Sequence, residues 1–369
     1  MSKILLSETT LGNLKLKNHI VMAPMTRSRA VNNNEVNDLV ATYYKQRSSA
    51  GLIITEGTSP SPNGTGYARI PGIYTEEQVN AWKLVTDKIH EEDGKVFLQI
   101  MHTGRISHEL NMKPGSKIVA PSAVAAKGEM YTDAEGMKAF PIPKELTLDE
   151  IKEVIEEYVQ ASKNAIKAGF DGVEIHGANG YLLEQFIAPN TNQRKDEYGG
   201  SIEKRSKIVL EITEKIIEAI GKDKVGIRLS PFGTASDIHP YAETNETFSY
   251  LAKELSKLEV VYIHLSDQSV FGAQAVDPET VKMIRKEFKG KLILCGGYNS
   301  EKAEKALEND AADLIAFGRP FISNPDLVER IRNGSELAQP DPNTFYSADE
   351  KGYTDYPTLK SLSLNSTKI

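Results

Sequence analysis

The amino-acid sequence predicts an α/β fold, a single (β/α)8 barrel domain covering residues 1–369, and two observations carry this prediction. Short apolar runs of four to six residues recur along the chain, and a longer segment with helical spacing follows each of them. Eight such runs occur, which is the number of parallel strands that closes this barrel. The predicted strands are residues 20–23, 52–55, 96–100, 172–176, 225–229, 260–265, 292–295 and 314–317.

An open, doubly wound sheet would give the same alternation of strands and helices. That fold normally has fewer parallel strands and a glycine-rich nucleotide-binding turn after its first strand. Here the first strand runs into Pro24-Met25-Thr26, and no Gly-x-Gly-x-x-Gly turn follows any predicted strand. The sequence therefore favours the barrel and indicates no separate dinucleotide-binding domain.

Local signals define the helices between the strands. Helical spacing covers residues 76–91 and 148–168. Thr147 precedes the second segment, and Glu150 three positions later completes a capping box, which satisfies free N–H groups at the start of a helix. We therefore expect this helix to begin directly after Thr147.

Three additions decorate the predicted barrel. Residues 4–17 form a candidate hairpin that closes the bottom, with Gly12-Asn13 at its turn. The stretch of residues 102–146, after the third strand, is too long for an ordinary βα loop, so we expect an excursion that covers the top face. The proline-containing tail after Arg332 is expected to be extended and to wrap back onto the barrel.

Composition and charge narrow the class of protein. Lys and Arg number 44 against 51 Asp and Glu, so the net charge is −7, which repels a nucleic-acid backbone in the absence of a basic patch. No apolar run approaches the roughly 20 residues of a membrane span, and the N-terminal apolar stretch is too short for a signal peptide. We expect a cytoplasmic protein, monomeric or homodimeric, that acts on small molecules and has no nucleic-acid or membrane partner.

Cysteine and histidine usage limits the redox chemistry. Cys295 is the only cysteine, which excludes an intrachain disulfide and any Cys-ligated zinc or iron–sulfur site built from this chain alone. No His-Glu-x-x-His motif occurs, and no metal site is predicted. Redox chemistry would require a bound organic cofactor. Within its apolar run, Cys295 is expected to be a small buried hydrophobe.

The carboxyl ends of the strands are where a barrel of this type carries its reactive groups. Successive side chains of a strand point to opposite faces, so Glu174 and His176 share one face of their strand and alternate with apolar residues. The same alternation separates Arg228 and Gln99 from the apolar side chains of their strands. We expect His176, Arg228 and Gln99 to face inward near the mouth of the barrel.

An inward-facing arginine indicates an anionic ligand, because a buried guanidinium without a negative partner is costly. Gly296 and Gly297 follow the seventh strand, and Gly318 and Arg319 follow the eighth. Loops at these two positions commonly bind phosphate through backbone N–H groups in such barrels. A phosphate at one end and an anionic ring over Arg228 at the other describe flavin mononucleotide (FMN).

Seven sequence words, in order along almost the whole chain, resemble the old yellow enzyme family of FMN-dependent ene-reductases. Within that family they are most similar to the branch that includes N-ethylmaleimide reductase, pentaerythritol tetranitrate reductase and the 12-oxophytodienoate reductases. The words are Met22-Ala-Pro-Met-Thr-Arg-Ser-Arg-Ala30, Glu56-Gly-Thr58, Gln99-Ile-Met-His-Thr-Gly-Arg-Ile-Ser-His108, Gly172-Val-Glu-Ile-His-Gly-Ala-Asn-Gly-Tyr-Leu182, Asn192-Gln-Arg-Lys-Asp-Glu-Tyr-Gly-Gly-Ser201, Arg228-Leu-Ser-Pro-Phe-Gly233 and Gly318-Arg-Pro320.

The resemblance implies tightly but non-covalently bound FMN and NADPH or NADH as the reductant. It implies that the Thr26 hydroxyl contacts the flavin ring near O4 and that Arg228 faces N1 and O2, where its charge stabilises the reduced, anionic ring. Because no dinucleotide domain is predicted, the reductant would enter the substrate pocket, which predicts ping-pong kinetics. The positions implied to hold the cofactor are Pro24, Met25, Thr26, Gly57, Gln99, Arg228, Gly296, Gly297, Gly318 and Arg319.

The resemblance also implies the substrate site. His176 and Asn179 match the pair that donates to a carbonyl or nitro oxygen and so polarises the adjacent C=C bond. Tyr181 matches the proton donor to the α-carbon, after hydride has reached the β-carbon from flavin N5. Tyr67 and Tyr353 match aromatic residues that wall the pocket. The expected substrates are enones, maleimides and nitroalkenes, with nitrate esters as a further class.

One position departs from the family pattern. Met101 stands where many relatives carry Trp, and a flexible thioether constrains a bound substrate less than an indole does. The stereochemical outcome therefore does not follow from the resemblance.

Two other functions fit parts of the pattern. A phosphate-binding lyase or isomerase on the same barrel would use Glu174 or lysine side chains and no flavin, although no lysine closes a predicted strand. A flavin-binding protein without turnover would keep the cofactor residues. Taken singly, His176 would be a core histidine, Tyr181 a packing aromatic and Gly296-Gly297 a tight turn; together at neighbouring strand ends they favour the enzyme.

Overall fold

A computed structural model describes residues 3–366 of the chain. The predicted strands form a closed parallel barrel in which each strand pairs with the barrel strands before and after it in the sequence, and β14 pairs with β3. Every predicted run overlaps one of them, so the fold class is confirmed. The barrel strands are β3 (Ile20–Met22), β4 (Leu52–Ile54), β5 (Val96–Ile100), β10 (Gly172–Gly177), β11 (Val225–Leu229), β12 (Tyr262–Ser266), β13 (Lys291–Cys295) and β14 (Leu314–Phe317).

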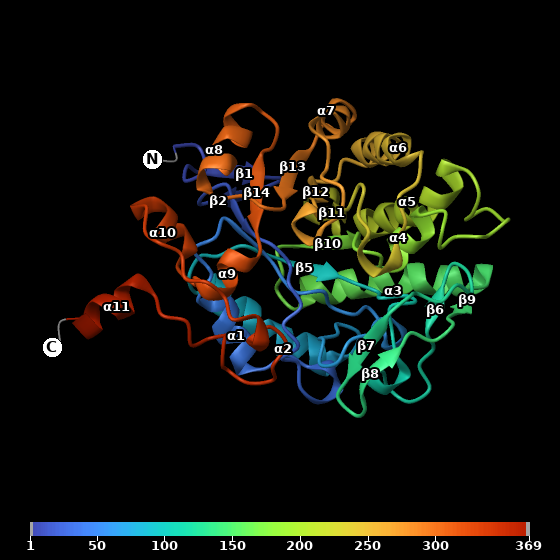
Figure 1. The fold of residues 1–369 in the computed structure, drawn as a ribbon, viewed down its shortest axis with the longest axis horizontal. Helices are drawn as coiled ribbons and strands as arrows, with labels where there is room; N and C mark the ends of the chain where they lie inside the picture. Colours follow the sequence, from blue (N-terminus) through green and yellow to red (C-terminus); the bar gives the residue numbers. More distant parts are fainter. Residues whose placement is uncertain (1–2, 367–369) are drawn as a thin grey trace.

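Helices surround the strands (Figure 1). The predicted capping box is present at the start of α3, where the Thr147 hydroxyl accepts from the Glu150 N–H at 3.2 Å and the Glu150 carboxylate accepts from the Thr147 N–H at 3.0 Å. The helices are α1 (Asp38–Lys45), α2 (Glu76–His90), α3 (Leu148–Lys167), α4 (Leu182–Ile187), α5 (Ile202–Ile220), α6 (Thr244–Lys257), α7 (Pro278–Glu287), α8 (Ser300–Glu308), α9 (Arg319–Ser323), α10 (Leu327–Asn333) and α11 (Leu359–Ser366). Among the described residues, no helix is long and apolar enough to span a membrane.

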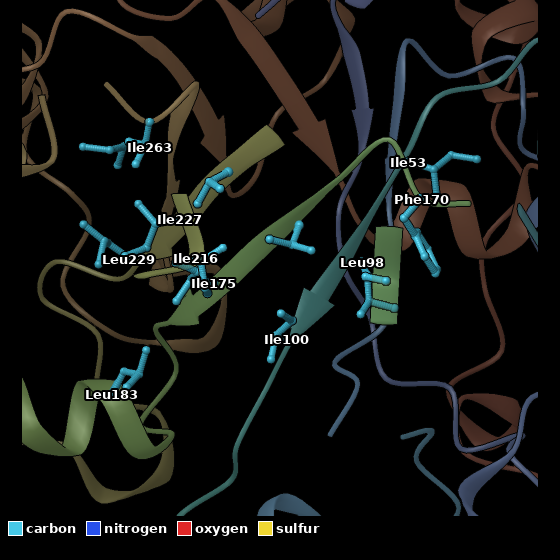
Figure 2. Packing of buried hydrophobic residues seen from close by; sticks show 14 of the residues in the cluster. Ile53, Leu98, Ile100, Phe170, Ile175, Leu183, Ile216, Ile227, Leu229 and Ile263 are labelled. Carbon is cyan, nitrogen blue, oxygen red and sulfur yellow. The ribbon is translucent and has the colours of Figure 1, made fainter. Parts of the chain in front are cut away.

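Two apolar layers follow from the alternation of side chains along the strands. The outward side chains of the strands pack under the helices, and Figure 2 shows Ile100, Ile175 and Ile227 of this layer. The inward side chains, among them Phe97 and Tyr262, fill the lower part of the barrel. The polar inward side chains of the same strands lie in the upper part of the barrel, near the carboxyl ends of the strands.

The N-terminal hairpin closes the bottom of the barrel, as predicted. Strands β1 (Thr9–Leu11) and β2 (Leu14–Leu16) pair in antiparallel fashion, and Gly12 adopts φ +53° at the turn between them. Leu11 and Leu16 are buried against the inward side chains of the barrel. Each such leucine contributes about 1.5–3 kcal/mol by leaving water.

The excursion after β5 holds two short sheets, formed by β6 (Val119–Ala120) with β9 (Lys144–Glu145) and by β7 (Glu129–Thr132) with β8 (Gly136–Ala139). Arg105, only 1% exposed, ties it to the loop after β11. Its guanidinium donates to the Val124 and Ala125 carbonyls on one side and to the Ser236 and Asp237 carbonyls on the other. The excursion is thus fixed at the carboxyl ends of the strands.

The C-terminal tail wraps back onto the barrel, as predicted. The Arg29 guanidinium donates to the backbone carbonyls of Thr344, Phe345 and Lys351. The tail is not extended throughout, because it also contains the helix α11. It therefore covers the segment that follows β3, close to the mouth of the barrel.

Candidate active site

A buried polar layer lies inside the barrel below its mouth. The Gln99 amide nitrogen donates to Glu174 Oε1 at 2.8 Å, and His264 Nδ1 lies 2.8 Å from Glu174 Oε2. The Glu174 and His264 side chains are both fully buried. Burial acts against a charged imidazole, but the Glu174 carboxylate outweighs it and raises the pKa of His264. These contacts fix Gln99 and Glu174, and they confirm that both face inward.

Arg228 lies beside this layer and has an unused donor. The Arg228 Nη2 atom is 3.3 Å from Ser266 Oγ and 3.7 Å from Cys295 Sγ. The Cys295 side chain therefore packs against the apolar residues inside the barrel and also contacts a cation. The buried Nε of Arg228 has no hydrogen-bond partner among the described residues. An orphaned buried donor costs about 1–3 kcal/mol, more when it is charged. The guanidinium therefore suits an anionic or oxygen-rich ligand, as the sequence predicts.

His176, at the end of β10, is held as a neutral donor. Its Nδ1 accepts from the Ala178 N–H at 3.2 Å, so the ring proton resides on Nε2. Burial, followed by the nearby charges of Arg228 and His264, lowers the pKa of His176 well below its usual value. At neutral pH the ring consequently presents an uncharged Nε2–H group.

Asn179 lies on the turn after β10 in a left-handed conformation, with φ +58°. Its backbone N–H donates to Ser230 Oγ at 3.0 Å, and Ser230 in turn donates to Glu184 Oε1 at 2.7 Å. The other Glu184 oxygen accepts from the Gly180 N–H at 2.6 Å. Burial raises the pKa of Glu184 to about 7. One buried carboxyl therefore supports the whole turn that carries Asn179.

Tyr181 follows this turn and meets both His176 and Tyr67. The rings of His176 and Tyr181 pack edge to face with centroids 4.9 Å apart. The Tyr181 hydroxyl donates to the Tyr67 hydroxyl at 3.1 Å. Burial raises the pKa of Tyr181, and the Tyr67 hydrogen bond partly opposes that shift. His176, Tyr181 and Tyr67 are thus brought together, with a protonated phenol at neutral pH.

The residues predicted to hold the cofactor ring lie at neighbouring strand ends. Pro24, Met25 and Thr26 follow β3 after one intervening residue, Ala23. Gly57 follows β4, and a Cβ atom there would lie 2.4 Å from Met101 Sδ, so only glycine leaves Met101 its place. Met101 is itself buried. Gly57, after β4, and the Met101 thioether, after β5, therefore pack closely against each other.

The predicted phosphate loops also lie side by side, because β13 and β14 are paired. Gly296 and Gly297 have φ +135° and +65°, and a Cβ on Gly296 would meet the Asp267 carbonyl oxygen at 2.6 Å. Gly318 and the exposed Arg319 follow β14, and the Arg319 guanidinium lies 4.7 Å from the centroid of the Phe271 ring. The geometry leaves the backbone of both loops open to a ligand.

Tyr353 does not lie where the sequence prediction placed it. It is fully buried and stacks on Tyr43, with ring centroids 4.0 Å apart, in a cluster with arginine side chains. Tyr346, which is 60% exposed, instead lies near Tyr67 and Tyr181 and, after burial, is among the groups that raise the pKa of both. The tail carries both tyrosines, and its spacing offered no rule for choosing between them.

His264 and Gln268 were missed by the sequence prediction. His264 alternates inward with Tyr262 and Ser266 along β12, a signal that was available in the sequence. Gln268 lies beyond that strand, and its contact with Asn179, 2.9 Å between Gln268 Nε2 and Asn179 Oδ1, joins two loops that no local pattern relates.

The barrel with this set of strand-end residues defines a flavin-dependent oxidoreductase, and comparison with known proteins names the family. The profile of the NADH:flavin oxidoreductase / NADH oxidase family matches residues 5–338, and the chain belongs to this family of old yellow enzyme-type, FMN-dependent alkene reductases. The putative 12-oxophytodienoate reductase 11 of Oryza sativa subsp. japonica is 40% identical and covers 97% of this chain and 98% of its own. A probable flavin mononucleotide-dependent alkene reductase of Leishmania infantum is 40% identical, and the match covers 96% of this chain and 98% of that protein.

Solved structures agree with this assignment. Morphinone reductase superposes with a TM-score of 0.93 at 42% identity, covering 98% of this chain and 97% of its own. The old yellow enzyme homologue from Zymomonas mobilis gives a TM-score of 0.93 at 40% identity, and the match covers 97% of this chain and 100% of that protein. The protein is therefore an NAD(P)H-dependent flavin oxidoreductase with FMN as its cofactor, and the flavin-free lyase considered from the sequence is not supported.

Proposed function

We propose that this enzyme reduces the C=C bond of small electrophilic alkenes such as enones, maleimides and nitroalkenes, with nitrate esters as a further class. The observation that supports the proposal is the arrangement at the end of β10 and in the turn after it, where a neutral His176 donor packs against a protonated Tyr181 and Gln268 holds the Asn179 amide. Two neutral donors suit an oxygen that gains negative charge as the alkene accepts hydride.

The residues around the mouth fit FMN. The Nε of Arg228, which has no hydrogen-bond partner in the part of the chain that the structure describes, suits an electron-rich ring edge, and Glu174 holds the Gln99 amide in place. Gly57 leaves room for the Met101 side chain beside it, and we propose that its backbone contacts the edge of the ring. We propose that Pro24, Met25 and Thr26 line the ring, and that Gly296, Gly297, Gly318 and Arg319 hold the phosphate without covalent attachment. When bound, FMN supplies the hydride to the alkene.

The protein's own part in the reaction is polarisation and proton delivery. His176 Nε2 and the Asn179 amide would donate to the carbonyl or nitro oxygen of the substrate and so make its β-carbon electrophilic. The Tyr181 hydroxyl, which burial keeps protonated, would then give its proton to the α-carbon. Tyr67 and Tyr346 would flank the same site.

We also propose that the reductant and the alkene use one pocket in turn, which gives ping-pong kinetics. No glycine-rich dinucleotide turn follows any strand of the barrel, and the site residues come from one set of strand ends. The net charge of −7 supports small molecules rather than nucleic acid as partners, in a cytoplasmic setting.

The visible absorption spectrum of the purified protein tests the function. We expect flavin bands that bleach with NADPH or NADH under anaerobic conditions and return when cyclohexenone is added. Bands that bleach but do not return with enone, maleimide or nitroalkene would contradict the proposed substrate class. Bands that no nicotinamide bleaches would favour a flavin-binding protein without turnover.

A further inference from the structure

The side-chain amide of Asn179 has two chemically opposite ends. Its nitrogen can donate to a substrate oxygen, whereas its oxygen would repel one. The backbone of Asn179, held by Ser230, fixes the position of this side chain but not which end faces the pocket. The proposed function requires the nitrogen to face the substrate. Some other group must therefore select the orientation.

Gln268 has the geometry to make that selection. Its Oε1 accepts from the backbone N–H groups of Thr234 and Ala235, both at 3.0 Å. A backbone N–H can only donate, so these two contacts assign the oxygen end of the Gln268 amide without ambiguity. The opposite end, Nε2, then lies 2.9 Å from Asn179 Oδ1 and donates to it.

The surroundings hold Gln268 in this place. Gln268 is only 5% exposed, so water does not readily replace the hydrogen-bond partners of its amide. A Cβ atom on Gly233 would lie 2.7 Å from Gln268 Nε2. Glycine at 233 thus makes room for the glutamine side chain, and the same loop supplies the two N–H groups that fix it.

We propose that Gln268 is a positioning residue that holds Asn179 with its amide nitrogen toward the substrate oxygen. The direction of hydrogen bonding passes from the backbone of the loop after β11, through Gln268, to Asn179. This inference rests on the proposed function, because it assigns a partner to a residue that the function places at the substrate.

Two substitutions of Gln268 separate orientation from loop support. Gln268→Glu keeps an acceptor for the Thr234 and Ala235 N–H groups, but an ionised carboxylate has no proton for Asn179 Oδ1. Asn179 then turns its nitrogen toward the carboxylate and its oxygen toward the pocket. Gln268→Met keeps the shape, removes both sets of hydrogen bonds and lets Asn179 take either orientation.

The probe is 4-nitrophenol, which binds as a phenolate oxygen and is titrated calorimetrically into the FMN-loaded protein at about pH 8, where an unperturbed Glu is ionised. We expect Gln268→Glu to weaken binding roughly 10- to 100-fold, the size of one hydrogen bond to a charged group. Gln268→Met should weaken it less, by roughly 2- to 10-fold. If Gln268 only supported the loop, Gln268→Met would weaken binding at least as much as Gln268→Glu, and if the Glu carboxylate only repelled the phenolate, the KM for neutral cyclohexenone would stay unchanged in Gln268→Glu. Either result would overturn the inference.

A matched control is Gln160→Glu. Gln160 also donates its Nε2 to an asparagine oxygen, Asn164 Oδ1 at 2.9 Å, but on the exposed face of α3. We expect it to leave phenolate binding unchanged. Wild-type protein that binds no phenolate, or Asn179→Ala that binds it as tightly, would refute the proposed site itself. Normal wild-type binding that Asn179→Ala weakens and Gln268→Glu does not would refute only the role of Gln268.

Discussion

The hydroxyl oxygens of Tyr67 and Tyr181 lie 3.1 Å apart, and the Tyr181 hydroxyl is the donor. This direction is the one expected while Tyr181 holds its proton. Once Tyr181 has given the proton away, the Tyr67 hydroxyl can turn and donate to the phenolate that remains. The pair therefore suits a residue that must lose and regain a proton in a buried site.

Tyr67→Phe should slow alkene reduction while leaving reduction of the flavin by NADPH unchanged. Burial raises the pKa of Tyr181 and the Tyr67 hydrogen bond lowers it, so removing that bond makes Tyr181 a weaker acid. One neutral hydrogen bond corresponds to roughly a 2- to 10-fold change in rate. Stopped-flow absorbance measures the two half-reactions separately, and equal slowing of both would refute this assignment.

Tyr181→Phe should slow the same step by roughly 10²- to 10⁴-fold, the range for loss of a general acid. The control is Tyr131→Phe on β7, because Tyr131 is 53% exposed. Cys295→Ala is a poor control, since the Cys295 sulfur lies 3.7 Å from Arg228 Nη2. An alkene step in Tyr181→Phe as fast as in the Tyr131 variant would show that the proton comes from elsewhere.

Tyr346 and Tyr353 should respond to alanine in opposite ways. Tyr353→Ala opens a cavity in a fully buried stack with Tyr43 and should lower the free energy of unfolding by about 3–5 kcal/mol. Tyr346→Ala removes an exposed ring beside Tyr67 and Tyr181, so stability should change by less than about 0.5 kcal/mol. Its KM for the alkene should rise roughly 2- to 10-fold, the worth of an aromatic contact. Urea denaturation and steady-state kinetics together check both expectations, and the reverse pattern would restore Tyr353 to the pocket.

Glu184 should make the protein less stable as the pH rises. Burial raises its pKa from 4.5 to about 7, so between these values the folded protein holds a proton that the unfolded chain has released. The free energy of unfolding therefore falls through this window, by about 3 kcal/mol in total. Glu184→Gln, which cannot ionise, should lose less stability than wild type between about pH 5 and pH 8.

Urea denaturation of the FMN-loaded protein at those two pH values measures the difference. Glu279→Gln, which removes an exposed carboxylate at the start of α7, serves as the control and should follow wild type. If Glu184→Gln shows the same loss of stability with pH as wild type, the buried carboxyl is already ionised at low pH.

The sequence predicts the barrel well because its strands are short apolar runs that signal their own position. The alternation along β10 and β11 likewise places His176 and Arg228 at the mouth, since a parallel barrel brings consecutive strands together. His264 was not predicted as a site residue because residues 262–266, Tyr-Ile-His-Leu-Ser, were interpreted only as a strand. The same alternation of side chains would have placed His264 inward.

Contacts between loops lie beyond such reasoning. Gln268 reaches Asn179 only because the turn at Gly233 leaves space for its amide, and no periodicity relates these three positions. The choice between Tyr346 and Tyr353 depended on how the tail folds back over Arg29, which proline and tyrosine spacing does not specify. The prediction of Tyr353 as a pocket residue failed for that reason.

The tether made by Arg105 has a consequence for how such an enzyme changes over time. All four of its close acceptors are main-chain carbonyl oxygens, at residues 124, 125, 236 and 237. Every amino acid supplies that acceptor, so these four hydrogen bonds do not depend on which side chains those positions carry, and the Asp237 carboxylate, 3.7 Å from Arg105 Nη2, adds an ion pair to them. The sequence of the excursion after β5 can accordingly change, through evolution or through design of a new substrate range, while these hydrogen bonds keep the excursion attached to the barrel.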